Sequence, residues 1–412
     1  MAWLVVFIPA LSYYMGTRLH SLGLFRSSSY GEVIETRLQV LDAAVSCDKL
    51  QSTFPLASCQ ENTAMMMATL KYPLYLVQQE MDQVVASCWQ HDSELGRGFL
   101  LLSTAGHAGR IWRWETGGGP IAIGRTLCVH DSGCRSEHFL NCSSTDNIMA
   151  GSGGIAIDSR GKDHFQEGSL MVAEWGEGRI VRLEENGART PLVIQVPDLC
   201  SNETTASVTR RVHQPYALLY TPFGDLLALD QYDCGDALIR LKQATHVEPL
   251  DSLPSSRKAH SWTSLNTTTL PEVVLSRSKL GGMALEPNWV KVYLTAKQGD
   301  SIVLLSVSLE EEDDQDETTL PKSQVVMDFT EHATAPGPIA VDKKGLIFLG
   351  VDKGVLIVQD SKVLARLNVP ETPTALTLGE DKFLYISIAS SLLRIRVNEG
   401  PVHVPTNLVV KK

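Results

Sequence analysis

Positive charge is scarce in this sequence. The 412 residues include 36 Lys and Arg against 47 Asp and Glu, which gives a formal net charge of −11. Sequence-independent binding of nucleic acid requires a basic surface, so this balance argues against a nucleic-acid partner. Long hydrophobic runs are missing too, because beyond the extreme N-terminus no apolar stretch is long enough to cross a membrane as a helix. Membrane contact is therefore expected only through the N-terminal segment, if that segment is not cleaved.

Short catalytic motifs are also missing. The sequence has no phosphate-binding G-x-x-x-x-G-K-[ST] motif and no G-x-S-x-G elbow for a serine nucleophile. The acidic run at 310–317 lacks the spaced aspartates and the glycine of a calcium-binding loop, so it predicts a solvated surface loop. No local signature therefore identifies an enzyme class.

What the sequence does contain is a repeated unit. Each copy opens with small and apolar residues, passes a polar or glycine-containing turn, and ends in a strand of the type R-I-x-R-L. The clearest copy spans 153–187, GGIAIDSRGKDHFQEGSLMVAEWGEGRIVRLEENG, and further copies start at Cys88, Pro215, Gly281, Gly337 and Pro373. One small sheet cannot bury both of its faces, whereas several sheets around an axis can. The repeats predict an all-β fold, a six-bladed β-propeller, over residues 84–400.

The two ends of the chain differ from the repeats. Residues 1–17 carry no charged side chain and contain AWLVVFIPALSYYM, which is typical of the apolar core of a signal peptide. We expect either a cleaved signal peptide or an uncleaved signal anchor there, with a buried first strand or helix as the alternative. Residues 18–83 have mixed patterning and predict an N-terminal extension that could supply a closing strand. Residues 401–412 are a C-terminal tail.

Two further features agree with the secretory pathway. Three N-x-[ST] sequences lie in polar stretches between predicted strands, so we expect N-glycosylation at Asn141, Asn202 and Asn266. The eight cysteines all lie in the first 234 residues. Their even number favours disulfides that join loops in the first half of the fold, in a protein that is secreted or membrane-anchored with its propeller outside the cytosol.

Three stretches of the repeats resemble a known family. They are RIWRWETGGG, then SLMVAEWGEGRIVRLEENGARTPLV followed by QPYALLYTPFGDLLALDQYDCG, and finally the segment from GPIAVDKKGLIFLGV to SLLRIRV. In this order and spacing they resemble the senescence-marker-protein/gluconolactonase family of six-bladed propellers, which includes regucalcin-like lactonases. The resemblance runs from about Cys88 to Gly400.

This resemblance implies hydrolysis of sugar lactones or related esters, and hence a small lactone or sugar-derived ligand. It also implies one divalent cation, calcium or zinc, held by carboxylate or amide oxygens at the channel mouth. The resemblance places Val85, Gly281 and Gly337 where the family has a glutamate, an asparagine and an aspartate ligand. Tyr216 and Ala217 replace its substrate-facing asparagine and the aspartate that follows. Valine and glycine side chains cannot coordinate a cation, so the chain either holds the ion differently or holds none.

Asp230, in LALDQYD, is the best-kept position and is our candidate catalytic residue and metal ligand. The candidate substrate-binding residues around it are Tyr216, His213, Glu174 and Trp175, and Trp175 could stack on a sugar ring. Each has a structural alternative. Asp230 could cap its own turn, His213 could be solvated, and Trp175 could pack between blades.

Two main hypotheses follow. The first is a divergent hydrolase of the lactonase family with any ion held by Asp230 and its neighbours. The second is a non-catalytic propeller that binds a partner or a small ligand at the channel mouth. A metal-free enzyme, as in strictosidine-synthase-like propellers, is a third option. Ancestry favours the first hypothesis, and the missing ligands favour the second.

Overall fold

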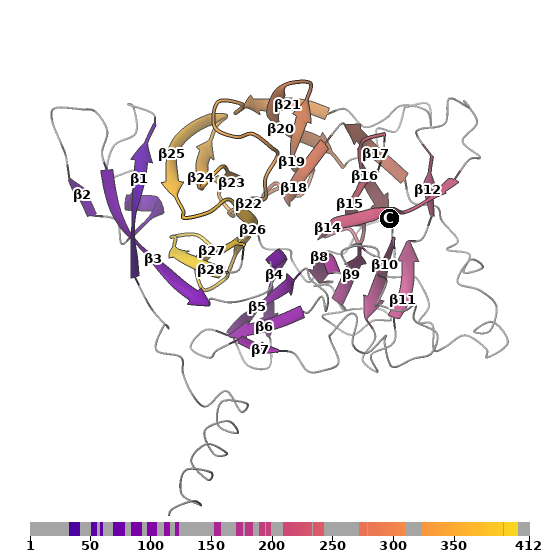
Figure 1. Ribbon diagram of the computed structural model, residues 1–412, viewed down its shortest axis with the longest axis horizontal. Helices are drawn as coiled ribbons and strands as arrows, with labels where there is room; N and C mark the ends of the chain where they lie inside the picture. The colour runs from indigo at the N-terminus through magenta and orange to yellow at the C-terminus, as the bar shows by residue number, and fades with distance from the viewer. Residues whose placement is uncertain are drawn as a thin grey trace, which may run out of the picture.

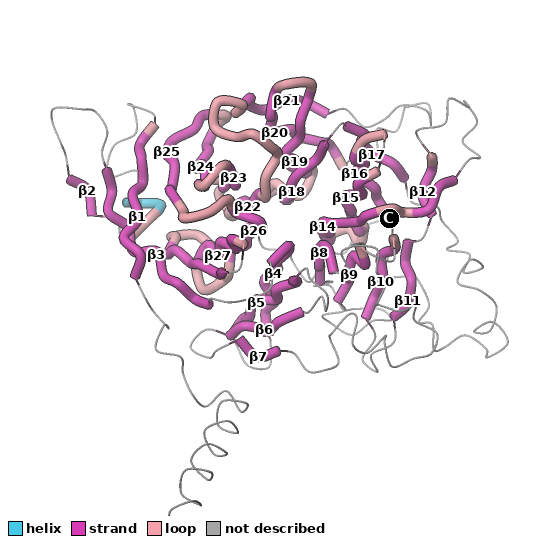
Figure 2. Tube along the Cα trace, viewed as in Figure 1, coloured by secondary structure: helices cyan, strands magenta, loops and turns pink. Residues whose placement is uncertain are grey.

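The structure is a computed structural model and consists almost entirely of antiparallel strands around a common centre (Figure 1). It describes residues 33–41, 51–55, 58–60, 69–78, 84–92, 97–104, 111–115, 120–122, 152–157, 170–175, 178–183, 189–193, 195–198, 209–232, 234–242, 272–277, 279–309, 323–389 and 391–402. A short helical turn at 51–53 is the only helix in these ranges (Figure 2). No helix that could cross a bilayer occurs in them.

Four of the sheets have four strands each, taken consecutively from the chain. The first contains β4 (Val84–Asp92), β5 (Arg97–Thr104), β6 (Ile111–Glu115) and β7 (Pro120–Ala122). The second contains β8 (Ser152–Ile157), β9 (Leu170–Glu174), β10 (Arg179–Leu183) and β11 (Arg189–Val193). The third contains β14 (Gln214–Tyr220), β15 (Leu226–Gln231), β16 (Asp236–Leu241) and β17 (Glu272–Arg277). The fourth contains β18 (Lys279–Leu285), β19 (Lys291–Gln298), β20 (Ser301–Ser308) and β21 (Ser323–Asp328). A separate pair is made of β12 (Gln195–Pro197) and β13 (Thr209–Arg211).

The remaining strands form one ten-stranded sheet. One part of it contains β22 (Ile339–Val341), β23 (Ile347–Val351), β24 (Gly354–Gln359) and β25 (Lys362–Asn368). Another part contains β26 (Pro373–Leu378), β27 (Phe383–Ile388) and β28 (Ser391–Arg396). The N-terminal strands are β1 (Val33–Val40), β2 (Ser58–Gln60) and β3 (Thr69–Gln78). They join the two parts, because β1 pairs with β25 and β3, and β3 pairs with β28.

The prediction of an all-β propeller is confirmed, but the described residues form five large sheets instead of six separate blades. The cause is the N-terminal extension. Backbone hydrogen bonds run without a break from β25 through β1 and β3 to β28, so two units of the repeat share one sheet. The first strands of the repeats nevertheless follow one another in a closed ring, in the order β4, β8, β14, β18, β22 and β26.

Burial explains why these segments form strands. All five residues of β9, LMVAE, and of β23, IFLGV, are buried, as expected for strands covered on both faces by neighbouring sheets. Such strands read as continuous apolar runs and lack the alternation of a half-exposed strand. Burying a large apolar side chain contributes roughly 1.5–3 kcal/mol.

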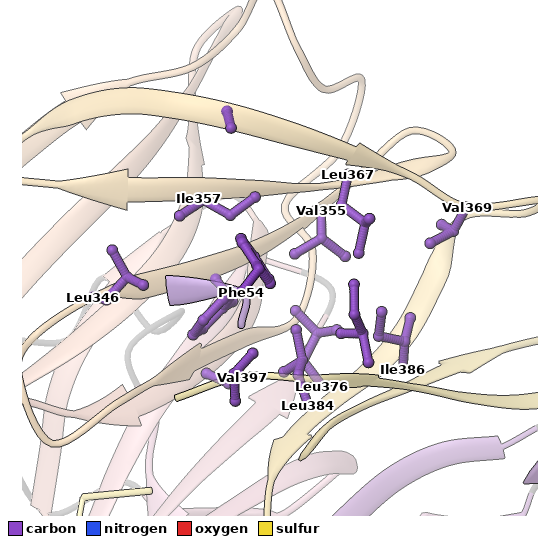
Figure 3. Close-up of a cluster of buried hydrophobic side chains, with 14 of the residues drawn as sticks. Phe54, Leu346, Val355, Ile357, Leu367, Val369, Leu376, Leu384, Ile386 and Val397 are labelled. Atoms are coloured by element: carbon purple, nitrogen blue, oxygen red, sulfur yellow. The ribbon is translucent and has the colours of Figure 1, made fainter. Parts of the chain in front are cut away.

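The shared sheet encloses a core that the N-terminal segment completes. Phe54, which is fully buried, belongs to one hydrophobic cluster with Leu346 and Val355 from one part of the sheet and Leu384 and Ile386 from the other (Figure 3). The backbone N–H of Asn398 donates a hydrogen bond to the carbonyl oxygen of Thr53, at 2.9 Å. The segment at 51–55 therefore packs between the two parts of this sheet and stabilises their association.

Candidate functional site

Five of the six first strands, all except β22, share an irregularity where they begin to pair with their second strands. The register shifts between Val84 and Ala86 in β4, between Ser152 and Ile155 in β8, and between Pro215 and Ala217 in β14. It shifts again between Leu280 and Met283 in β18, and between Pro373 and Ala375 in β26. Bulges of this kind redirect a side chain and are common beside functional sites. We call the residues at these shifts, together with Gly337 just before β22, the bulge ring: Val85, Gly153, Gly154, Tyr216, Gly281, Gly282, Gly337 and Thr374.

The glycines of the bulge ring are required by close packing between neighbouring sheets. A Cβ atom on Gly281 would lie 2.4 Å from Thr295 Oγ1, and one on Gly337 would lie 2.1 Å from the carbonyl oxygen of Gly350. The Thr295 hydroxyl donates to the carbonyl oxygen of Gly337 at 2.6 Å and accepts from the N–H of Gly282 at 2.9 Å. Positions 281 and 337 therefore have no room for the asparagine and aspartate that the family resemblance implies.

Asp230 lies at the end of β15 and is fully buried. Its Oδ2 accepts a hydrogen bond from Arg210 Nη1 at 2.7 Å. Its Oδ1 accepts the backbone N–H groups of His213 at 3.1 Å and Gln214 at 2.9 Å. Burial raises the pKa of the Asp230 carboxyl above its ordinary value, although Arg210 and the two N–H groups act in the opposite direction. Both oxygens of this candidate metal ligand are therefore occupied by the chain itself.

His213 is exposed next to this carboxylate. Its Nδ1 lies 3.2 Å from the carbonyl oxygen of Gln231, and its ring meets the ring of Tyr232 edge to face at 5.8 Å. The Arg210 guanidinium lies 4.0 Å from the centre of the Tyr232 ring, within the range of a cation–π interaction. Arg210 is thus held by both Asp230 and Tyr232.

Glu174 and Trp175 belong to the neighbouring sheet, where Glu174 is the last residue of β9 and Trp175 begins the turn that follows. Glu174 is buried and forms an ion pair with Arg179, the first residue of β10. Gly178 closes this turn with a φ of +57°, and a Cβ atom there would lie 2.5 Å from the carbonyl oxygen of Val212 and 3.1 Å from that of His213. The turn therefore packs against the segment before β14. The structure brings Trp175, His213 and Asp230 into one neighbourhood, which we call the mouth cluster.

Trp175 has a feature suited to binding. Its side chain is partly exposed, and its buried indole N–H has no hydrogen-bond partner in the part of the chain that the structure describes. The exposed part of this ring can stack on a ligand, and the N–H beside it is a donor that the described chain leaves unpaired.

Tyr216 points away from the mouth cluster toward the next sheet. Its hydroxyl lies 3.1 Å from Asp236 Oδ2 and 2.9 Å from the carbonyl oxygen of Leu280, and shares one proton between these acceptors. Asp236 Oδ2 also accepts the N–H of Leu280 at 2.7 Å. Burial and the nearby Asp236 raise the pKa of Tyr216 well above its ordinary value, so the phenol stays neutral. Tyr216 joins two sheets in this arrangement.

The residues present do not fit the divalent cation that the family resemblance implies. Calcium requires six to eight oxygen ligands, and zinc in proteins takes nitrogen, sulfur and carboxylate ligands. The bulge ring offers valine, glycine, tyrosine and threonine, and the Thr374 hydroxyl already donates to the carbonyl oxygen of Val84 at 2.5 Å. Within the described ranges, no three His, Cys, Asp or Glu side chains gather closely enough to hold a metal ion.

Several other predicted features lie outside the described residues. These are the glycosylation candidates Asn141, Asn202 and Asn266 and the N-terminal segment at 1–17. Cys88 is described and is a free thiol, so the expected disulfides do not include it. Burial raises the pKa of the Cys88 thiol to about 12, which makes it an unreactive part of the core.

Comparisons with known proteins agree with the fold. No protein-family model matches the chain, and no curated protein matches it. The structure is similar to that of a gluconolactonase from Xanthomonas campestris, with a TM-score of 0.59 and 14% sequence identity over 90% of this chain and 98% of the other. A second structure, provisionally assigned as a gluconolactonase, gives a TM-score of 0.56 and 14% identity over 89% of this chain and 99% of the other. The resemblance to gluconolactonase propellers is thus confirmed at the level of the fold, which does not establish an activity.

Proposed function

We propose that this protein is a gluconolactonase-like propeller that binds a small polar ligand at the mouth cluster and does not catalyse metal-aided hydrolysis. The bulge ring carries the proposal. Its described positions offer no carboxylate or amide side chain, and its glycines are enclosed by the backbone of neighbouring strands. A Lewis-acid ion needs several such oxygens and one open position.

Asp230 supports the same conclusion. A metal ligand must present free lone pairs to the ion, and a general base must accept a proton from substrate or water. Here Arg210 and two backbone N–H groups already use both carboxylate oxygens. Releasing Asp230 for either task would leave a buried guanidinium without its partner, which is costly. We therefore assign Asp230 to positioning Arg210 and the start of β14, and not to catalysis.

The ligand would be a small neutral, sugar-derived molecule. Trp175 supplies a ring face and an N–H donor, and the exposed His213 adds a second polar group. Aromatic faces with a few convergent polar groups are typical of sites for such ligands. A metal-free ester hydrolase remains the second candidate, since the exposed His213 could act as a base.

The decisive experiment combines a metal titration with an activity assay on the purified protein. Calcium, zinc and manganese are titrated while the melting temperature is followed, and aldonolactones and aryl esters are assayed for turnover. We expect no metal-dependent rise in melting temperature and no turnover, because a bound ion would stabilise the folded state by mass action. Turnover that disappears on chelation would overturn the proposal, and metal-independent turnover that His213→Gln abolishes would favour the second candidate.

A binding assay tests the positive half of the proposal. Glucono-δ-lactone and neutral monosaccharides are titrated while tryptophan fluorescence is recorded. We expect saturable binding that Trp175→Phe weakens about tenfold or more, since a lost donor and reduced stacking together are worth more than 1.4 kcal/mol. The matched control is Trp289→Phe, because Trp289 lies in the turn between β18 and β19, at the other end of its sheet. Equal loss in both variants would argue against the mouth cluster.

We also propose that the ring has six blades, the ten-stranded sheet contributing two. The closed order of the six first strands supports this count. A secretory route is proposed from the apolar segment at 1–17 and the three sequons, with support from Cys234, which is disulfide-bonded. Glycosidase treatment of the protein from secreting cells should increase its gel mobility, and unchanged mobility would count against glycosylation.

A further inference from the structure

A cavity of about 330 Å³ lies between two neighbouring units of the propeller, away from the mouth cluster. Its walls come from the turn between β18 and β19, the turn between β22 and β23, and the turn between β24 and β25. The first two turns join a first strand to a second strand, whereas Asp230 lies where a second strand ends. The cavity is therefore at the opposite end of the sheets from the mouth cluster.

The cavity contains a carboxylate that is only partly satisfied. Glu286 Oε1 lies 3.4 Å from the Tyr293 hydroxyl, at the outer limit of a hydrogen bond. Glu286 Oε2 is buried and has no hydrogen-bond partner among the described residues. A buried carboxylate oxygen without a donor costs free energy that a bound donor would recover. Burial and Glu286 together raise the pKa of Tyr293, which keeps its hydroxyl neutral and unable to neutralise the carboxylate.

The charge around this carboxylate is negative. Asp360 lines the same cavity and adds a second carboxylate. Of the described residues in the lining, Lys344 is the one cation, and its ammonium forms an ion pair with Glu399, which also pairs with Lys343 at 2.7 Å. Among the described residues of the lining, two carboxylates therefore face one ammonium, and that ammonium is already engaged by Glu399. A positively charged donor is the complementary ligand.

The remaining walls define the shape of that ligand. Pro287, Val326 and Ile347 supply apolar surface, and Tyr293 adds an aromatic ring. Gly345, at φ +84°, gives the turn between β22 and β23 a left-handed conformation that favours glycine, and this turn lies beside Pro287. A hard metal ion would gain nothing from apolar walls, whereas an alkyl chain would be desolvated by them.

We propose that this cavity binds a primary ammonium group carried on a short aliphatic chain, with Glu286 as its ion-pair partner. Asp360 supplies a second, more exposed negative charge at the rim. The ammonium donates to Glu286 Oε2, and the chain lies along Pro287, Val326 and Ile347. The same chemistry is presented by a free alkylamine and by the lysine side chain of another protein. The proposal does not depend on what the mouth cluster binds.

The test measures binding of pentylamine to the full-length protein by calorimetry, with pentan-1-ol as the uncharged analogue. We expect pentylamine to bind at least tenfold more tightly than pentan-1-ol, because the ammonium forms an ion pair with the Glu286 carboxylate whereas the alcohol offers only a neutral donor. Glu286→Gln should weaken pentylamine binding at least tenfold, and Asp360→Asn should weaken it a few-fold. Glu331→Gln, which alters an exposed acid in another segment, is the matched control and should leave binding unchanged.

Three results would overturn the proposal. The first is equal affinity for pentylamine and pentan-1-ol, and the second is an unchanged affinity in Glu286→Gln. Displacement of bound pentylamine by millimolar calcium would also contradict it, because the site would then prefer an inorganic cation. A further arm compares pentylamine with a blocked lysine, N-acetyl-lysine methylamide. Tighter binding of the blocked lysine would assign the cavity to a lysine side chain of a protein, and tighter binding of pentylamine would assign it to a free amine.

Discussion

Two acids at opposite ends of the sheets differ in how fully their carboxylate oxygens are hydrogen-bonded. Asp230 is fully buried, and Arg210 and two backbone N–H groups use both of its oxygens. Glu286 is half-buried and has one weak partner, and its second oxygen has none in the described part of the chain. The acid that the family resemblance points to is therefore built into the scaffold. The acid that no motif marks is the one available for a ligand.

The largest expected effect comes from matched isosteric substitutions at these two acids. Asp230→Asn should destabilise the protein by about 3 kcal/mol, because an amide places its own donor among three donors and leaves Arg210 without a counter-charge. Glu286→Gln should not lower stability by more than about 0.5 kcal/mol, since only one weak hydrogen bond is lost and an unpaired charge is removed. Urea unfolding of the two variants beside wild type measures both. Similar losses in the two variants would remove the distinction between the acids.

The second effect concerns the bulge ring. The resemblance places Gly281 where the family has an asparagine that binds the metal, and Gly281→Asn restores that residue. We expect a loss of about 2–3 kcal/mol without any gain in calcium affinity, because the new side chain meets Thr295 Oγ1 and the backbone of Pro336. Thermal unfolding with and without calcium gives both quantities. A stable variant whose melting temperature rises with calcium would show that the ring can still be converted into a metal site.

The third effect is a smaller one at the junction of two sheets. Tyr216→Phe removes a hydroxyl that lies against Asp236 and the carbonyl oxygen of Leu280. We expect a loss of about 1–2 kcal/mol, the usual cost of leaving a buried acceptor without a donor. Ligand binding at the mouth cluster should not change, because Tyr216 points to the neighbouring sheet. Binding and unfolding measured on the same preparation separate the two roles. A variant with normal stability and weakened ligand binding would return Tyr216 to the ligand site.

The sequence predicts much of this architecture because each repeat contains the consecutive strands of a single sheet. The copy at 153–187 places β9 and β10 through its apolar run and its R-I-x-R-L strand. For residues 18–83 the sequence suggests only that they could supply a closing strand. That β1 and β3 would both enter one sheet between two units could not be predicted, because this segment lacks the repeat and VIETRLQV fits a helix or a strand. Only pairing with β25 and β3 selects the strand.

Less of the candidate site could be predicted from the sequence. Asp230 could be placed at a strand end, but its partner Arg210 lies 20 residues earlier, and no local spacing links them. One signal was present, since a fully buried acid needs a donor or a cation. Glu286 carried no motif at all. Its environment is made by turns from separate repeats, and such a cavity exists only when the sheets are packed together.

The smallest expected effect comes from Glu399→Gln, which removes the carboxylate that pairs with Lys344 beside the cavity. Glu399 lies between Lys343 and Lys344, whose hydrogen bonds lower its pKa from an ordinary 4.5 to about 2. A carboxyl with a lowered folded-state pKa stabilises the protein above its unfolded pKa and loses this contribution as the pH falls through the folded value. Glu399→Gln should therefore be slightly less stable than wild type at pH 7, and the difference should close between pH 4.5 and about 2. Thermal unfolding across this range measures it, and a difference that persisted at pH 2 would contradict the assignment.

The same variant sharpens the comparison between the two acids. Without Glu399, the ammonium of Lys344 loses its partner while it still lines the cavity that contains Glu286. Lys344 could then approach Glu286, much as Arg210 occupies Asp230, and the cavity would supply its own cation. We expect pentylamine binding to fall at pH 7 in Glu399→Gln and to return in the double variant Glu399→Gln, Lys344→Met, because that variant has no competing ammonium. Unchanged binding in the single variant would mean that Glu399 does not keep the cavity open to a positively charged ligand.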